Sequence, residues 1–361
     1  MAKKARKKAC DFTLLLATLL LVFIGIIMVF SSSWPEGIKT FNDGYHFLKK
    51  QIIAASLGLI AMLFFMNFNY RRLNRMSRFI FIVSILSGLL IFTPLGLSTK
   101  GARRWVNLGF TTFMPSDIIK LGSIIFLSSF LSKRKEDVKD IKKGLIPSLL
   151  IIGLSCGMIY LQRDLSTTVT LGATLMSILF VAGMKISHLV FVIIAAILGL
   201  FKAITDEDNA YRMRRFISFI DPFADKTDSG WQVVQSLYAL GSGGLFGLGL
   251  GKSRQKFFYI PEPHNDFIFA IIGEELGFLG ALTVVLLFLL LVWRGIRIAL
   301  NVDDLFGCLL ASGIVALITI QSLIHIGVVT SSIPPTGIPL PFVSYGGTSL
   351  MLYMSAIGIL L

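Results

Sequence analysis

A carboxylate beside a long apolar run is the first candidate for chemistry. Asp266 ends a polar stretch that begins at Pro261 and directly precedes the apolar run 267–292. An Asp at a helix start can simply accept hydrogen bonds from the first turn. At a half-dry interface a carboxylate can also serve as a general base. His264 and Lys252 bring further polar groups nearby, so Asp266 is our catalytic candidate, with capping as the alternative.

A charged pair at the start of the apolar run 115–132 is the second candidate. Asp117 and Lys120 are three residues apart, a spacing that lets them pair on one face of a helix. A charge inside a membrane span is costly and suggests function by default. The alternative is a buried ion pair that orients two helices, and the spacing leaves both open.

Two basic and aromatic patches could bind an anion. Arg103 and Arg104 precede Trp105, and Arg214 and Arg215 precede Phe216. Guanidinium groups beside an aromatic ring suit a phosphate or pyrophosphate at headgroup level. Anchoring to lipid headgroups is the alternative.

Asp164 lies in the short loop between two apolar runs. It either pairs with one of the arginines or caps the helix that follows.

The glycine-rich stretch Gly247–Ser253 is similar to a nucleotide-binding loop. The motif requires a glycine at position 246, where this chain has Phe246. None of the four His has a second His or a Cys at ligand spacing, so we expect no zinc site, and His325 is interpreted as a buried polar group.

Apolar segments must position all these residues. Hydrophobic residues make up 55% of the 361 residues and charged residues only 15%, which excludes an ordinary soluble domain. A membrane span needs about 20 apolar residues. The sequence therefore predicts an all-α polytopic membrane protein with about ten transmembrane helices, at 12–31, 51–68, 78–96, 115–132, 145–161, 166–184, 187–204, 267–292, 305–329 and 344–361.

The basic residues predict the orientation. Nearly all of the net charge of +14 falls on one side of the spans if the N-terminus is cytoplasmic. This distribution argues against nucleic-acid binding and places both termini in the cytoplasm. We expect one domain, 1–361, with a basic cytoplasmic N-terminus at 1–11. A large extracytoplasmic loop, 205–266, joins helices seven and eight and contains a short helix at 230–240.

Several motifs together are similar to those of one family. The chain resembles the SEDS (shape, elongation, division and sporulation) family of bacterial cell-wall polymerases over nearly its whole length, most closely its division and sporulation branch. The motifs are Gly101–Trp105, Pro115–Asp117 with Lys120, Gln235–Gly244, His264–Ala270 with Gly273–Gly277, and Pro339–Gly347 including Ser344.

The resemblance implies a function. It implies a peptidoglycan glycosyltransferase that polymerises lipid II at the outer face of the bacterial cytoplasmic membrane during septal wall synthesis. It also implies a class B penicillin-binding protein as partner, other division-complex membrane proteins, and a growing glycan linked to undecaprenyl pyrophosphate. Asp266 matches the family's essential loop aspartate. A lipid II flippase and a non-catalytic scaffold for the penicillin-binding protein are the alternatives.

The implied reaction needs a base and cations. A single displacement inverts the anomeric carbon, with Asp266 as base for the attacking hydroxyl. The leaving pyrophosphate needs cationic stabilisation, for which we expect a divalent cation, Mg²⁺ or Mn²⁺, with ligands unassigned. The expected substrate-binding residues are Arg103, Arg104, Trp105, Asp117, Lys120, Asp164, Arg214, Arg215, Gln235, Lys252, His264 and Ser344.

The chain departs from the family pattern at three places. The family motif Q-P-D-L-G reads Gln162-Arg163-Asp164-Leu165-Ser166 here. His325 stands where the family usually has Asn. Asp117 replaces a Glu, so its pairing with Lys120 has a shorter reach.

Overall fold

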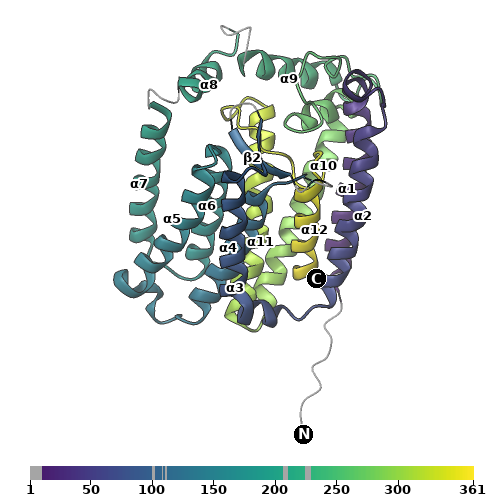
Figure 1. Ribbon diagram of the computed structural model, residues 1–361. Helices are drawn as coiled ribbons and strands as arrows, with labels where there is room; N and C mark the ends of the chain where they lie inside the picture. Colours follow the sequence, from purple (N-terminus) through teal and green to yellow (C-terminus); the bar gives the residue numbers. More distant parts are fainter. Residues whose placement is uncertain (1–9, 100–101, 108, 110–111, 206–209, 224–228) are drawn as a thin grey trace.

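Long apolar helices dominate the computed structural model of the chain (Figure 1). The structure describes residues 10–99, 102–107, 109, 112–205, 210–223 and 229–361. Within these residues, eight helices are long and apolar enough to cross a membrane, and α6 and α12 are shorter apolar helices. The ten are α1 Phe12–Phe41, α2 His46–Asn67, α3 Tyr70–Leu89, α4 Pro115–Ser132, α5 Ile146–Tyr160, α6 Leu165–Val181, α7 Ile186–Thr205, α10 Ile268–Asn301, α11 Leu305–Val329 and α12 Gly347–Leu360.

Each of the ten predicted spans corresponds to one of these helices, although some boundaries differ. Helix α1 continues ten residues past its predicted end, through Pro35. Ring packing supports this extension, because Trp34 lies 5.4 Å from Phe30 and 5.1 Å from Tyr45 between ring centroids. Helix α3 begins at Tyr70, earlier than predicted, so the following arginines lie on its first turns.

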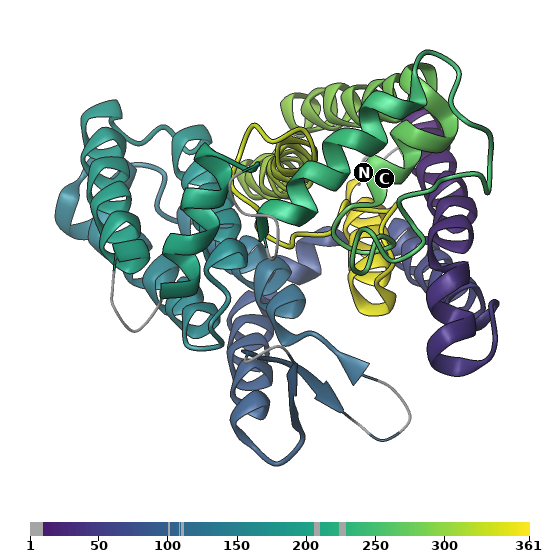
Figure 2. The same cartoon turned by 90° about the horizontal axis from the view of Figure 1, so that it is seen from above.

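A small antiparallel sheet departs from the predicted all-helical pattern. Its strands are β1 Gly96–Thr99, β2 Ala102–Asn107 and β3 Thr112–Phe113, in the order β1-β2-β3. Figure 2 shows them projecting from one side of the bundle. The strands have two to six residues, too few for a clear alternating pattern.

Two further helices cross the end of the bundle that lies away from Phe12 and Leu361, here called the distal end (Figure 1). They are α8 Ala210–Ile220 and α9 Ser229–Gly243. Helix α9 confirms the predicted short helix and extends it at both ends. It packs on α10, and the Ser236 hydroxyl donates to the Val329 carbonyl oxygen at 3.0 Å. At the opposite end, the first residues of α1 and the last of α12 line one hollow.

Helix α10 is interrupted at Gly277, whose φ of 68° and ψ of −167° are not helical. This region of φ and ψ is essentially restricted to glycine. The backbone groups released by the break bond to the loop 244–249 instead. Leu248 and Gly249 donate to the carbonyls of Glu274 and Glu275 at 2.9 and 3.0 Å, and Phe278 donates to that of Gly244 at 2.8 Å.

We predict that Gly277→Ala destabilises the fold. An added Cβ would lie 2.2 Å from the Gly247 nitrogen, and the backbone conformation alone costs about 1–3 kcal/mol for a residue with a side chain. The measurement is the thermal unfolding of purified protein in detergent. Gly241→Ala is the control, because its Cβ meets nothing within 4 Å. Equal melting temperatures for the two variants would contradict the prediction.

Candidate active site at the distal end

The connection between α11 and α12, residues 331–346, is the centre of the candidate site; we call it the α11–α12 segment. Buried side chains hold its non-helical backbone. Gln321 donates to the Pro339 carbonyl at 2.9 Å, and His325 Nδ1 lies 2.8 Å from the Ile338 carbonyl oxygen. Gln51 of α2 donates to the Ser344 carbonyl and accepts from the Gly346 amide, both at 3.4 Å.

Asp266 lies against this segment. Gly337 has a φ of 72°, and a Cβ added there would lie 3.3 Å from Asp266 Oδ2. The Asp266 side chain is half-buried. Helix α10 has Phe267 as its N-cap residue, without a side-chain capping bond, so Asp266 lies one residue before the N-cap position. Its role as a base and its alternative role as a cap both stay predictions.

Hydrogen bonds fix the backbone on both sides of this contact. The Ser344 hydroxyl donates to the Asn265 carbonyl at 2.7 Å and accepts from the Leu340 amide at 2.8 Å. The Tyr345 amide donates to the His264 carbonyl at 2.9 Å. The Ser344 hydroxyl thus bonds to backbone groups of the protein, and its contact with substrate stays a prediction.

One of the predicted arginines of α8 reaches the same segment. Arg215 Nη1 donates to the Pro335 carbonyl at 3.4 Å. Arg214 lies on the same helix, but its side chain is outside the described residues. A guanidinium group therefore lies on the segment that also meets Asp266.

His264 is buried beside this segment, with 2% of its surface exposed. Its ring lies 4.5 Å from that of Phe47 and 5.5 Å from that of Tyr345 between centroids. Burial lowers the pKa of His264 to about 4, although the Glu262 carboxylate acts in the opposite direction. Its Nδ1 lies 3.6 Å from a Glu36 carboxylate oxygen, which is too long for a hydrogen bond, so burial dominates.

Asp117 and Lys120 form a buried ion pair in α4, with 2.9 Å between Oδ1 and Nζ. The exposed fractions are 2% and 4%. Ser349 of α12 donates to the second carboxylate oxygen. The predicted pairing is confirmed, and it links α4 to α12; substrate binding by the pair stays a prediction.

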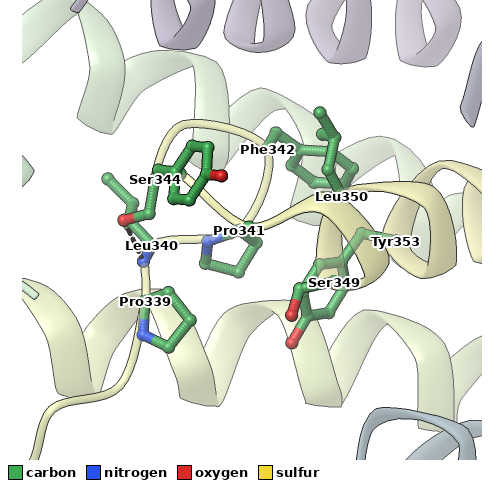
Figure 3. A pocket seen from close by; sticks show the side chains of 10 residues that line it. Pro339, Leu340, Pro341, Phe342, Ser344, Ser349, Leu350 and Tyr353 are labelled. Atoms are coloured by element: carbon green, nitrogen blue, oxygen red, sulfur yellow. Dashed lines mark hydrogen bonds between the residues drawn. The ribbon is translucent and has the colours of Figure 1, made fainter. Parts of the chain in front are cut away.

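A small pocket lies between the α11–α12 segment and the start of α12 (Figure 3). Ser344 and Tyr345 line it at the segment, where both contact the 264–265 backbone. Ser349 lines it on α12 and holds Asp117. The residues that line this pocket therefore contact both the backbone just before Asp266 and the buried ion pair.

Asp164 fulfils both predicted alternatives. It caps α6 by accepting from the Thr167 amide at 3.0 Å, and its Oδ2 lies 3.5 Å from Arg104 Nε. Arg104 also donates to the Arg163 carbonyl at 3.2 Å. Arg163, which departs from the family motif, thus holds Arg104 through its backbone carbonyl.

The two arginines of β2 differ in their surroundings. The register between β1 and β2 shifts at Arg104, because Trp105 pairs with Leu97 and Arg103 with Ser98. Arg103 is exposed, while Arg104 is half-buried and lies beside Asp164. Trp105 is half-buried, and Gly101 of the same motif lies outside the described residues. Gln235 is buried in α9, and Lys252 is exposed in the loop after Gly249; substrate binding by these residues stays a prediction.

Two residues were missed from sequence, Gln51 and Gln321. Each is fully buried. Gln321 interrupts an apolar run, which is the signal that could have identified it, whereas Gln51 follows two lysines at the start of such a run. Among the described residues, no group of three or more His, Cys, Asp or Glu side chains could hold a metal ion.

Comparison with known proteins places the chain among cell-wall proteins. The family model of FtsW, RodA and SpoVE, described as a cell cycle protein, matches residues 12–361, which confirms the SEDS resemblance. The chain is 44% identical to the stage V sporulation protein E of Bacillus subtilis, covering 99% of this chain and 97% of that protein. It is 38% identical to a probable peptidoglycan glycosyltransferase FtsW of Geobacter sp. (strain M18), with the same coverage.

Solved structures agree with this placement. A chain from a structure described as the structural coordination of polymerization and crosslinking by a peptidoglycan synthase complex matches with a TM-score of 0.81 and 27% identity, covering 98% of this chain and 97% of that one. The rod shape determining protein RodA of Thermus thermophilus matches with a TM-score of 0.71 and 26% identity, covering 98% and 96%. The fold and the multi-pass membrane architecture are therefore shared.

We predict that Lys120→Met destabilises the protein strongly, because it leaves the Asp117 carboxylate buried without its counter-ion. Breaking such a buried pair costs about 3–5 kcal/mol. The double variant Asp117→Asn/Lys120→Met removes both charges and should recover most of the loss. Thermal unfolding in detergent measures both, and a double variant less stable than the single one would contradict this account.

We also predict a pH-dependent stability that originates from His264. Its pKa is about 4 in the folded protein against an ordinary 6.5, so the unfolded chain binds more protons between these values. The contribution is complete above pH 6.5 and is lost as the pH falls to 4, by about 3 kcal/mol. In His264→Gln the decline in melting temperature over this range should be smaller than in wild type. An identical decline in both proteins would exclude His264 as its source.

Proposed function

Because the chain belongs to the FtsW, RodA and SpoVE family of cell cycle proteins, we propose that it is a peptidoglycan glycosyltransferase that polymerises lipid II. The single observation that carries the chemistry is the position of Asp266. Its half-buried carboxylate lies against Gly337, at the distal end of the apolar bundle. A carboxylate in this position can accept the proton of a hydroxyl as a general base.

The reaction follows from the placement of this base. Asp266 accepts the proton of the attacking sugar hydroxyl as its oxygen bonds to the anomeric carbon of the donor. The bond from that carbon to the pyrophosphate oxygen breaks, and undecaprenyl pyrophosphate leaves with the electron pair. One displacement inverts the anomeric centre, so no covalent sugar–enzyme intermediate is needed.

Cations support the leaving group in this proposal. Arg215 lies on the segment that meets Asp266, and Arg104 is oriented by Asp164. Fixed guanidinium groups stabilise developing phosphate charge. We further propose that a divalent cation, Mg²⁺ or Mn²⁺, accompanies the pyrophosphate of the substrate, since Mg²⁺ commonly binds through substrate phosphates.

The orientation supports an outer site. From the basic loops we infer that both termini are cytoplasmic, and the distal end, which carries Asp266, then faces outward. We propose a class B penicillin-binding protein as the partner that crosslinks the new strand. The similarity to a chain described in a peptidoglycan synthase complex supports this partner, and the sporulation relative supports a role in septal wall synthesis.

We predict that Asp266→Asn abolishes polymerisation, because the amide cannot take up the hydroxyl proton. Loss of a general base lowers turnover roughly 10²- to 10⁴-fold. The assay measures glycan chains made from labelled lipid II by purified protein, with and without its partner. The variant should fold, insert and bind the partner as wild type does.

Lys49→Met is the matched control, because it breaks only the exposed pair with Asp43, 2.8 Å between Nζ and Oδ2. It should polymerise normally. Wild-type activity in Asp266→Asn would remove Asp266 as the base. Wild-type protein that transports labelled lipid II without polymer would indicate a flippase, and partner binding without either activity would indicate a scaffold.

A further inference from the structure

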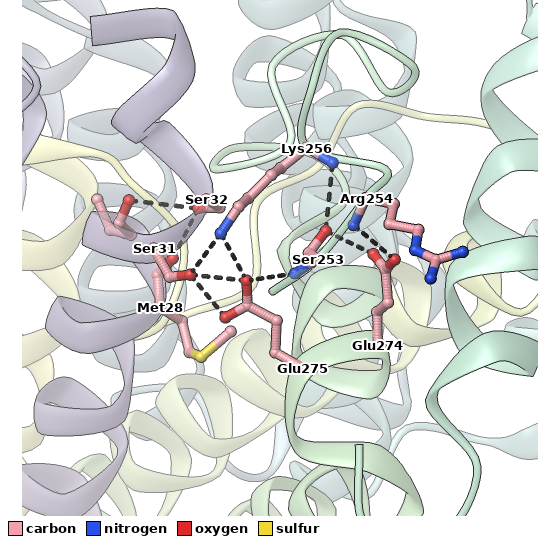
Figure 4. Close-up of polar contacts among 9 residues, drawn as sticks. Met28, Ser31, Ser32, Ser253, Arg254, Lys256, Glu274 and Glu275 are labelled. Carbon is pink, nitrogen blue, oxygen red and sulfur yellow. Dashed lines mark hydrogen bonds and ion pairs between the residues drawn. The ribbon is translucent and has the colours of Figure 1, made fainter. Parts of the chain in front are cut away.

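A buried charged cluster lies at the break of α10, apart from the groups assigned to the reaction (Figure 4). It contains the carboxylates of Glu274 and Glu275 and the ammonium group of Lys256. Their exposed fractions are 1%, 0% and 5%. Removing such groups from water is expensive, so each needs close partners.

Glu275 connects three elements. Lys256 Nζ lies 2.8 Å from Glu275 Oε1. The Ser31 hydroxyl of α1 donates to the same carboxylate at 2.6 and 2.8 Å, and the Ser253 amide donates at 3.2 Å. Lys256 also donates to the Ser31 hydroxyl at 3.2 Å. Helix α1, helix α10 and the loop at 253–256 are thereby held at one point.

Glu274 fixes the same loop through different atoms. It accepts from the Ser253 hydroxyl at 2.5 Å and from the Arg254 amide at 2.8 Å. The loop is therefore held through backbone and hydroxyl groups, whose geometry tolerates little displacement.

The break at Gly277 gives this cluster its significance. Upstream of it, the residues 268–276 form a short helical piece that starts two residues after Asp266. Because helical continuity with the rest of α10 ends at Gly277, contacts at the end of this piece must fix its direction. The backbone bonds from the loop 244–249 make some of those contacts, and the Glu275 side chain makes those that reach α1 and Lys256. Its partners therefore help to set where the piece, and Asp266 before it, lies relative to Gly337.

We propose that Lys256, Glu275 and Ser31 form a clamp that positions Asp266 for glycan polymerisation. The inference rests on the proposed function and adds three positioning residues to it. None of the three needs to touch the substrate. Their effect is to hold the base within reach of the attacking hydroxyl, where a misplacement of about 1 Å can cost a hundredfold in rate.

The decisive variant is Glu275→Gln/Lys256→Met, which removes both charges and leaves no buried ion without its partner. If the pair serves only stability, a double variant that keeps the wild-type melting temperature should also keep the wild-type kcat. The clamp predicts a kcat for lipid II polymerisation that is lower by about 10- to 100-fold, with KM nearly unchanged. Lys256→Arg keeps the charge and should recover part of the loss relative to Lys256→Met.

Ser31→Ala provides a second test that alters no charge. It removes the bond from α1 and should lower kcat severalfold, which decides the question if the double variant does not fold. Lys49→Met, at the exposed pair with Asp43, is the control and should behave as wild type. Wild-type kcat in Ser31→Ala and in any folded double variant would overturn the clamp. Absence of glycan from wild-type protein would instead overturn the proposed function.

Discussion

Backbone groups inside an apolar bundle must find partners within the protein, because no water is available to replace them. The structure leaves the helical pattern at two important places, the α11–α12 segment and the break of α10. Buried amides from Gln51 and Gln321 hold the first. The loop 244–249 supplies the second with the bonds that the helix lost at Gly277. Asp266 lies between these two irregular regions, so its position depends on both being satisfied.

Buried charged side chains likewise need partners within the protein. Asp117 with Lys120 and Glu275 with Lys256 are close pairs, each with a hydroxyl as additional donor. Such pairs contribute little net stability, since desolvation offsets attraction, but they specify which groups can lie together. Here each pair joins helices that are distant in sequence, α4 with α12 in one case and α1 with α10 in the other. Their value lies in fixing geometry around the site.

Sequence patterns identified much of this correctly for a simple reason. A span is a long local run of apolar residues, so ten helices and the short helix α9 could be read from the chain alone. The i to i+3 spacing of Asp117 and Lys120 is equally local, and the pair forms as expected. The strands β1 to β3 were missed because short strands give weak local patterns and depend on their neighbours.

The sequence by itself determined the membrane architecture, the positions of the ionisable residues and the resemblance that directed attention to Asp266. Only the tertiary structure decided which of those residues act together. It placed Asp266 one residue before the N-cap of α10, brought Arg104 to Asp164, and gave Asp164 both of its suggested contacts. The contact between Asp266 and Gly337 joins residues 71 positions apart. Such a contact has no local periodicity to reveal it, because it arises from how satisfied backbones and paired charges pack in three dimensions.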